Sequence, residues 1–342
     1  MVKQQAKAGM TAVLCSNIVG VSMAFSGMGY WSLATQGLVF VGVNTVLLWR
    51  CSPWRPSLRI DFGPVRRMFR FSVKVLATGI LNNVNSNVLN ILLGRYFSPY
   101  ATGCYNQAYQ WDNKCYYLVQ GTVQQVTQPV LADLSGQSSR RLGAMRKMVR
   151  LISFVSFPLL FGLGLVAREF IVLAITDKWL FSAGLMQILC ISGAVMPLHT
   201  FLSNVVLSCG RSGVNLWCTC GLGLASIVLM VCIWPLGIRS MVVGYTALNL
   251  LWVLVWHFFV RRLTGYGFVM FMRDTLPFAI AAMAVMAATY FATAWIGNMA
   301  VLLVARIAVA AVLYYAVMRV ARVHILNECQ QFIVNKLFKR KH

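Results

Sequence analysis

Amide side chains gather in two neighbouring segments of this chain, and they are the groups best suited to bind a ligand. In the first segment, residues 69–97, three asparagines follow one another at helical spacing. Asn83, Asn87 and Asn90 are four and three residues apart, so a helix would place them on one face. Each amide offers both hydrogen-bond donors and an acceptor. The spacing therefore predicts a polar helix face for a ligand rich in hydroxyl groups.

The second segment, residues 100–133, adds glutamines and aromatic rings to this pattern. Two stripes of candidates run along it: one is Gln120 and Gln124, and the other is Gln107, Trp111 and Lys114. Amides can bind the hydroxyl groups of a sugar while an aromatic ring packs against its apolar face. Together the two segments predict sugar binding and imply no covalent chemistry.

Cations outnumber acids in these two segments. Lys74, Arg95 and Lys114 stand against Asp112, the one acid that lies clearly inside a predicted span. A polar site with this balance favours an anionic ligand and disfavours cations. Structural roles are the alternative for two of these residues: Lys74 would snorkel to a membrane surface, and Arg95 would lock two helix ends together.

Hydrogen bonding between helices is the alternative use of any single amide. Such bonds between membrane helices are worth about 0.6 kcal/mol on average. A dozen polar side chains on two successive helices would be a costly way to obtain that stabilisation. A water-filled cavity that they line explains the whole set better.

The elements that must position these residues are membrane spans. Hydrophobic residues make up 59% of the 342 residues and charged residues 11%, with a mean hydropathy of +0.71, whereas soluble proteins carry roughly 25% charged residues. Segments of about 20 apolar residues, which cross a bilayer, predict about ten helices. Their expected ranges are 9–28, 31–49, 70–95, 101–133, 148–168, 183–209, 214–236, 240–260, 275–295 and 299–318. The fold class is therefore all-α, a polytopic helix bundle.

The positive charges predict the orientation of this bundle. When the gaps between spans are numbered alternately, one set holds 23 of the 30 lysines and arginines and the other set holds 4. Cytoplasmic loops carry the excess of positive charge, so both termini are expected in the cytosol. Residues 322–339 read as a basic amphipathic helix on that surface, where anionic lipid would be its partner. The net charge of +23 thus indicates orientation and not nucleic-acid binding.

Sequence motifs for metal or cofactor chemistry are missing from the chain. It has no P-loop, HExxH or CxxC pattern, and most of its ten cysteines lie in predicted spans as small apolar side chains. The longest predicted outer gap, residues 169–182, has only Glu169 and Asp177 as acids. We therefore expect neither cofactor, metal nor enzymatic activity.

Six stretches of the chain resemble one family. They are Gly29–Gln36 (GYWSLATQ), Leu47–Arg59, Leu89–Phe97 (LNILLGRYF), Thr102–Tyr109 (TGCYNQAY), Pro129–Leu134 and Lys178–Trp179. In order and spacing they are similar to the polysaccharide transporter family, the lipopolysaccharide, O-antigen and capsule flippases of the multidrug/oligosaccharidyl-lipid/polysaccharide exporter superfamily. The resemblance covers essentially the whole chain, which opens where the family's fifth span would be.

The resemblance implies an organisation into lobes. Such transporters have two lobes and about twelve to fourteen spans in all. The expected parts here are residues 1–65 with the last two spans of the first lobe, 66–262 as the six-span second lobe, 263–320 as a terminal helix pair, and 321–342 as the basic tail.

The resemblance also implies a function and a location. The chain would flip an undecaprenyl-diphosphate-linked oligosaccharide across the bacterial inner membrane for lipopolysaccharide, capsule or exopolysaccharide biosynthesis, alongside other glycan-export machinery. Lys74, Arg95 and Lys114 are then the candidates for diphosphate contacts, and the amides would line the sugar path. The alternatives are an inactive remnant of such a flippase, a cation-coupled drug exporter and a membrane enzyme of glycan assembly.

Overall fold

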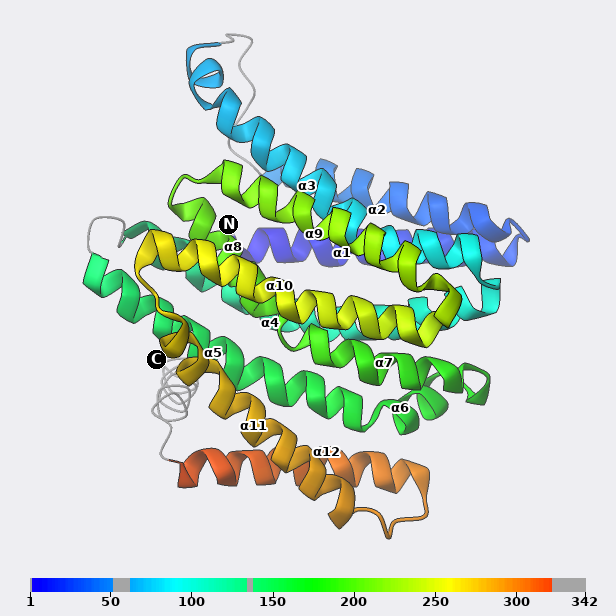
Figure 1. Cartoon of the computed structure of the whole chain (residues 1–342). Helices are drawn as coiled ribbons and strands as arrows, with labels where there is room; N and C mark the ends of the chain where they lie inside the picture. Colours follow the sequence, from blue (N-terminus) through cyan, green and yellow to red (C-terminus); the bar gives the residue numbers. More distant parts are fainter. Residues whose placement is uncertain (1, 52–61, 134–137, 322–342) are drawn as a thin grey trace, which may run out of the picture. The chain divides into compact units, whose positions relative to one another are not determined.

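The computed structural model describes residues 2–51, 62–133 and 138–321 (Figure 1). Within these helices, the side chains of residues 2–6, 62–68, 70–71, 122–133 and 138–139 are not described. The predicted amphipathic segment 322–339 lies outside the described residues.

The described residues form helices joined by short turns, and this confirms the all-α prediction for them. Their bounds are α1 Val2–Phe25, α2 Gly29–Cys51, α3 Phe62–Tyr96, α4 Pro99–Asp133, α5 Ser138–Leu165, α6 Ala167–Ala174, α7 Leu180–Gly193, α8 Met196–Ser208, α9 Ser212–Ile233, α10 Ile238–Thr264, α11 Phe268–Ala292 and α12 Met299–Val320. Two 3-10 turns, Asp177–Trp179 and Trp234–Leu236, precede α7 and α10.

Eight helical segments are long and apolar enough to cross a membrane, counted over the described residues. They are Lys7–Phe25, Gly29–Cys51, Arg140–Leu165, Asp177–Ser208, Ser212–Leu236, Ile238–Thr264, Phe268–Ala292 and Met299–Val320. The other two predicted spans correspond to α3 and α4, which have 35 residues each but are more polar. Each of these helices is longer than a bilayer requires. Their polarity, and not their length, therefore distinguishes them from the eight apolar segments.

The chain divides into two compact units, Met1–Arg67 and Met68–His342. In the first unit, α1 and α2 form a hairpin that turns through Gly27, whose φ of 77° suits a residue without Cβ. Gln36 on α2 donates a hydrogen bond to the Asn17 amide oxygen at 2.6 Å. Amide pairs of this kind hold helices together in lipid.

The second unit is built around α4, α5, α7, α8 and α10. Phe201, Met241 and Leu185 are fully buried among these helices. Figure 1 shows α9, α10, α7 and α5 running side by side, with α11 and α12 following. The helix pair α11 and α12 packs on α5 within this unit.

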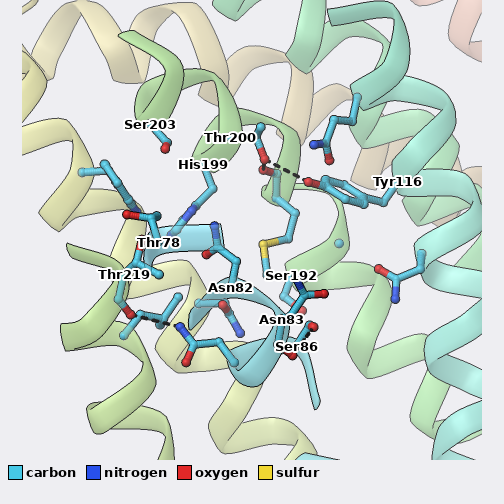
Figure 2. A pocket seen from close by; sticks show the side chains of 18 of the residues that line it. Thr78, Asn82, Asn83, Ser86, Tyr116, Ser192, His199, Thr200, Ser203 and Thr219 are labelled. Atoms are coloured by element: carbon cyan, nitrogen blue, oxygen red, sulfur yellow. Dashed lines mark hydrogen bonds between the residues drawn. The ribbon is translucent and has the colours of Figure 1, made fainter. Parts of the chain in front are cut away.

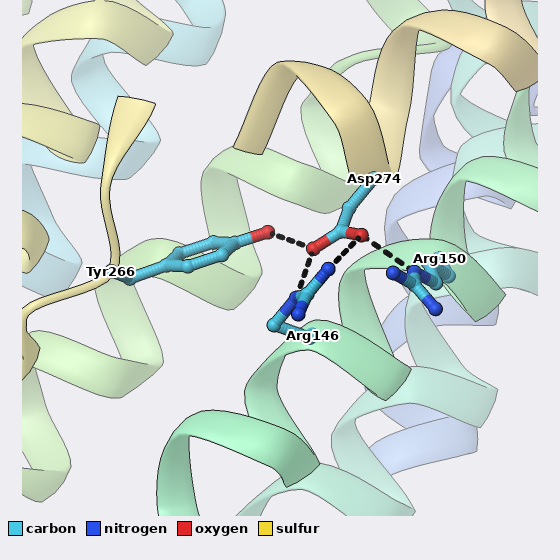
Figure 3. A network of polar contacts seen from close by, with 4 residues as sticks. All are labelled: Arg146, Arg150, Tyr266 and Asp274. Atoms are coloured by element: carbon cyan, nitrogen blue, oxygen red, sulfur yellow. Dashed lines mark hydrogen bonds and ion pairs between the residues drawn. The ribbon is translucent and has the colours of Figure 1, made fainter. Parts of the chain in front are cut away.

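Two buried ion networks tie α11 and α12 to the rest of the second unit. The Asp274 carboxylate of α11 is fully buried and accepts hydrogen bonds from Arg146 Nε at 2.9 Å, Arg150 Nε at 2.6 Å and Tyr266 Oη at 3.0 Å (Figure 3). Arg306 of α12 pairs with Glu169 of α6 at 2.8 Å. Each carboxylate thus meets a guanidinium from another helix.

The predicted span 183–209 is not a single helix. It is interrupted at Ala194 and Val195, between α7 and α8, and Pro197 lies in the first turn of α8. Proline has no backbone N–H and therefore suits a helix start. The hydroxyl of Ser156 on α5 donates to the Ala194 carbonyl oxygen at 2.6 Å. A backbone acceptor that the break leaves inside the membrane is thereby satisfied.

Candidate functional site

A cavity of about 470 Å³ lies inside the second unit, and side chains of α3, α4 and α7–α10 line it. Figure 2 shows polar side chains of these helices pointing toward one another across it. The lining is largely amide and hydroxyl: Thr78, Asn82, Asn83, Asn85, Ser86, Asn113, Gln120, Ser192, Thr200, Ser203, Asn204, Asn215, Thr219 and Asn249. Aromatic rings add Tyr109, Tyr116, Tyr117, Tyr245 and Trp256.

Helix α3 has two parts with different roles. Its last turns are anchored in the core, where Leu89 and Leu93 are buried. The preceding turns, from Thr78 to Ser86, carry the side chains that line the cavity. This part contacts α9 through a polar side chain, because the Asn85 amide nitrogen donates to the Thr219 carbonyl oxygen at 3.0 Å.

Helix α4 lines the cavity with one face only. Residues 109, 112, 113, 116 and 120 share this face, as expected at 3.6 residues per turn. Tyr116 shares a hydrogen bond with the hydroxyl of Thr200 on α8 at 2.9 Å. The opposite face carries Trp111, whose ring packs edge-on against Phe170 at 4.7 Å between centroids.

Six polar atoms of the lining are buried and have no hydrogen-bond partner in the described part of the chain. They are Asp112 Oδ1, Gln120 Oε1, His199 Nε2, Asn204 Nδ2, Asn249 Oδ1 and Trp256 Nε1. Buried polar groups are normally paired, and an unpaired one costs about 1–3 kcal/mol. Such a set of donors and acceptors suits a polar ligand or ordered water.

The charge of the lining differs from the expected one. It contains the acid Asp112 and no lysine or arginine. The three predicted cations, Lys74, Arg95 and Lys114, lie outside the lining of the cavity. The cavity is therefore polar and weakly acidic, not cationic.

Lys74 lies twelve residues into α3, and Arg95 lies in its last turn. The Lys74 ammonium reaches the first turn of α9, 3.5 Å from where a Cβ on Gly213 would lie. Arg95 is exposed in the last turn of α3, beside Tyr96, whose ring stacks on Trp234 at 5.0 Å. Neither residue lines the cavity.

Lys114 lies on the face of α4 that points away from the cavity. Its ammonium is 3.7 Å from the centre of the Trp111 ring, a cation–π contact. Gln107 belongs to the same stripe and does not line the cavity either. The second predicted stripe of α4 is thus separate from the site.

Asn83 and Gln120 are the predicted amides that line the cavity. Asn87 is exposed, and its amide nitrogen donates to the Asn83 carbonyl oxygen of the same helix at 2.8 Å. Asn90 lies one turn further on and does not line the cavity, although its Oδ1 is buried without a partner among the described residues. The side chain of Gln124 lies outside the described residues.

The sequence analysis missed the residues that α8 and α10 contribute. His199 and Ser203 are four residues apart on α8, and Asn249 and Trp256 are seven apart on α10. Both spacings place the pair on one helix face. This periodicity within otherwise apolar spans is the signal that could have identified them.

A multi-pass bundle of membrane helices around a polar cavity defines the class of the protein, a polytopic helical membrane protein. Over 90% of this chain and 67% of the other, the structure is similar to the lipid II flippase MurJ in its inward closed conformation, with a TM-score of 0.64 and 14% sequence identity. At this identity the likeness concerns the fold.

The family model for "Polysaccharide biosynthesis protein" matches residues 1–183, and the chain belongs to this family. α3 and α4 fall within the match. The protein is thus a multi-pass protein of the inner membrane from a family of polysaccharide biosynthesis.

Curated relatives support this membership. The chain is 30% identical to the teichuronic acid biosynthesis protein TuaB of Bacillus subtilis over 46% of this chain and 33% of that one. It is 24% identical to the succinoglycan biosynthesis transport protein ExoT of Rhizobium meliloti over 76% and 51%. It is 22% identical to the lipopolysaccharide biosynthesis protein WzxC of Escherichia coli over 58% and 42%. The chain spans about a third to a half of the length of these relatives.

Proposed function

We propose that the chain acts in a flippase that moves a lipid-linked oligosaccharide across the bacterial inner membrane. The observation that carries the proposal is the cavity, where amides, hydroxyls and aromatic rings meet inside a membrane bundle. Polar groups in a membrane interior are costly and are typical of a substrate pathway. Family membership in polysaccharide biosynthesis and the names of the relatives agree with a glycan as cargo.

The cavity would take the sugar part of this substrate. Its lining offers donors and acceptors together on amides such as Asn83 and Asn113, and on hydroxyls such as that of Thr200. Sugar hydroxyls are both donors and acceptors and would satisfy both kinds. The tyrosine rings of α4 would pack against the apolar faces of the sugar rings.

The diphosphate would contact Lys74 and Arg95 on α3 and not the cavity. Lys74 and Arg95 are about 31 Å apart along the helix axis, at 1.5 Å per residue, which matches the roughly 30 Å of a bilayer's hydrocarbon core. Lys74 would meet the phosphates at one membrane surface and Arg95 at the other. A guanidinium can hold two phosphate oxygens at once.

Asp112 favours a second candidate function, a drug exporter of the same superfamily that takes up cationic compounds. It is the charged residue of the lining, and its sign is negative. The charge of the ligand distinguishes the two functions. Such an exporter binds organic cations, whereas a glycan flippase does not require them.

Binding to the purified chain tests the proposal. In detergent or nanodiscs, we expect binding of undecaprenyl-diphosphate-linked oligosaccharide and at least tenfold weaker binding of undecaprenyl phosphate without sugar, a difference of about 1.4 kcal/mol. Equal binding of the two lipids would overturn the sugar site. Tight binding of an organic cation without the glycan lipid would favour the exporter.

A further inference from the structure

Asp112 has no counter-ion in the cavity. The residue is 6% exposed, and its Oδ1 is buried with no hydrogen-bond partner in the described part of the chain. No lysine or arginine lines the cavity, and Lys114, two residues further on, is engaged with the Trp111 ring on the opposite face of α4. An ionised carboxylate in such surroundings costs several kcal/mol.

The titratable groups around Asp112 come from four helices, and none is a permanent cation. They are Tyr105, Tyr109 and Cys115 of α4, Cys190 of α7, His199 of α8 and Tyr245 of α10. The α3 and α9 residues that line the cavity are amides, hydroxyls and apolar side chains. On α5, Arg146 and Arg150 are bound to Asp274.

The carboxylate lies against the break between α7 and α8. Gly193, the last residue of α7, has no Cβ at the place where the Asp112 oxygens lie, and a Cβ built there would collide with them. The hydroxyl of Ser156 holds the other side of the break at Ala194. A broken helix is a site where two helix halves can change their angle, because the backbone hydrogen-bond ladder is already interrupted.

We propose that Asp112 is a proton-binding site that controls access to the cavity. Its carboxyl group is protonated while the lobe is closed around it. Loss of the proton favours a lobe opened at the α7–α8 break, where water reaches the carboxylate. The proposal depends on the proposed function only in treating this cavity as the site of transport.

A proton fits this position better than a metal ion or an ammonium group. Asp112 Oδ1 is out of reach of solvent, because the backbone of Gly193 lies against the carboxylate. Hard metal ions require several oxygen ligands around an open space, and no cluster of three His, Cys, Asp or Glu exists among the described residues. A proton requires no such space.

Infrared spectroscopy of the purified chain tests the protonation without any glycan. At neutral pH the wild type should show the carbonyl band of a protonated carboxylic acid, and Asp112→Asn should lack it. Asp177→Asn, a change at an exposed acid outside the cavity, should leave the band unchanged. A wild type in which the band is missing at neutral pH, or persists in Asp112→Asn, would overturn the proposal.

Alkylation of an introduced cysteine tests the control of access. In a chain without other reactive cysteines, the rate at Thr78→Cys, a buried position in the cavity lining, is divided by the rate at Asn87→Cys, which is exposed outside it. The ratio removes the rise in thiolate fraction that both cysteines share. It should rise with pH, by up to about tenfold per pH unit, the limit for one linked proton.

The same ratio should not depend on pH in Asp112→Asn and should behave as in the wild type in Asp177→Asn. A pH-independent ratio in the wild type would contradict the proposal even if glycan binding is confirmed. Failure of glycan binding would leave both of these measurements interpretable, because neither uses a substrate.

Discussion

Two polar regions of the second unit differ in whether their buried polar groups have partners. Around α11 and α12, each buried carboxylate pairs with arginine: Asp274 with Arg146 and Arg150, and Glu169 with Arg306 (Figure 3). In the cavity between α3, α4 and α8–α10, six buried polar atoms have no partner among the described residues (Figure 2). The first region pairs its buried charges with opposite charges and holds helices together. The second has buried polar groups without a partner in the described chain, beside a cavity that a polar ligand can enter.

The difference separates structural polarity from functional polarity in a membrane protein. Removing one partner from a completed pair should destabilise the fold and leave binding intact. Changing an uncompensated group should weaken binding and leave the fold intact. The following predictions run from the largest expected effect to the smallest.

Glu169→Ala should cost the most stability. Both side chains of the Glu169–Arg306 pair are nearly buried, at 6% and 8% exposed, so the change strands a guanidinium at a cost of about 3–5 kcal/mol. Thermal unfolding in detergent should show the loss. In the double variant Glu169→Leu with Arg306→Met, stability should return to near the wild type, since apolar replacement of a whole pair is often neutral. A Glu169→Ala protein as stable as the wild type would show that this pair does not hold α12.

Asp274→Ala should have the next largest effect. The carboxylate is fully buried, but the Arg146 and Arg150 side chains are 35% and 43% exposed. Because these guanidiniums can regain water, we expect a loss of about 2 kcal/mol, less than for a wholly buried pair. Glycan-lipid binding should be unchanged once the protein is folded. Asp177→Ala is the matched control and should alter neither property.

Gly193→Ala should destabilise the fold by about 1–3 kcal/mol, because overpacking forces side chains out of place. The new methyl group would meet the Asp112 carboxylate. Gly121→Ala is the control on α4, since a Cβ there meets nothing within 4 Å, and it should stabilise the helix by about 0.5–1 kcal/mol. If both variants unfold at the same temperature, Asp112 does not pack on the helix break.

Asn83→Ala combined with Gln120→Ala should change stability least, by less than about 1 kcal/mol, because neither amide completes a buried pair between helices. Glycan-lipid affinity should fall about tenfold or more, since two hydrogen bonds contribute about 1 kcal/mol each. Asn87→Ala on the next turn of α3 should bind as the wild type. Equal losses of affinity in the double variant and in Asn87→Ala would remove the distinction between the two regions.

The fold could be predicted from the sequence because lipid imposes strong rules on it. Spans had to be long, apolar and helical, and the polar character of α3 and α4 was visible in their amides. The break between α7 and α8 was not predicted, because Pro197 lies inside a run as apolar as any other span. The contact of Asp112 with Gly193 at this break joins residues 81 positions apart, which sequence patterns do not reveal.

The site could be predicted only in part, for a geometric reason. Periodicity shows which residues share a face but not which face meets a cavity. On α4 the stripe with Trp111 and Lys114 and the face with Asp112 and Tyr116 look equally polar in sequence, yet only the second lines the site. The cations were grouped by sequence proximity, whereas Lys74 and Arg95 are 21 residues apart on one helix and neither lines the cavity.

Photo-crosslinking tests the central claim most directly, that the uncompensated cavity receives the glycan. A photoreactive amino acid is placed at Asn83 or at Asn87 of α3, and the purified chain is irradiated with an oligosaccharide-diphospholipid labelled in its sugar. The two positions are one turn apart, one lining the cavity and the other exposed outside it. We predict label at Asn83 and little at Asn87. Equal label at both positions, or label at Asn87 alone, would contradict the assignment of the cavity to the sugar.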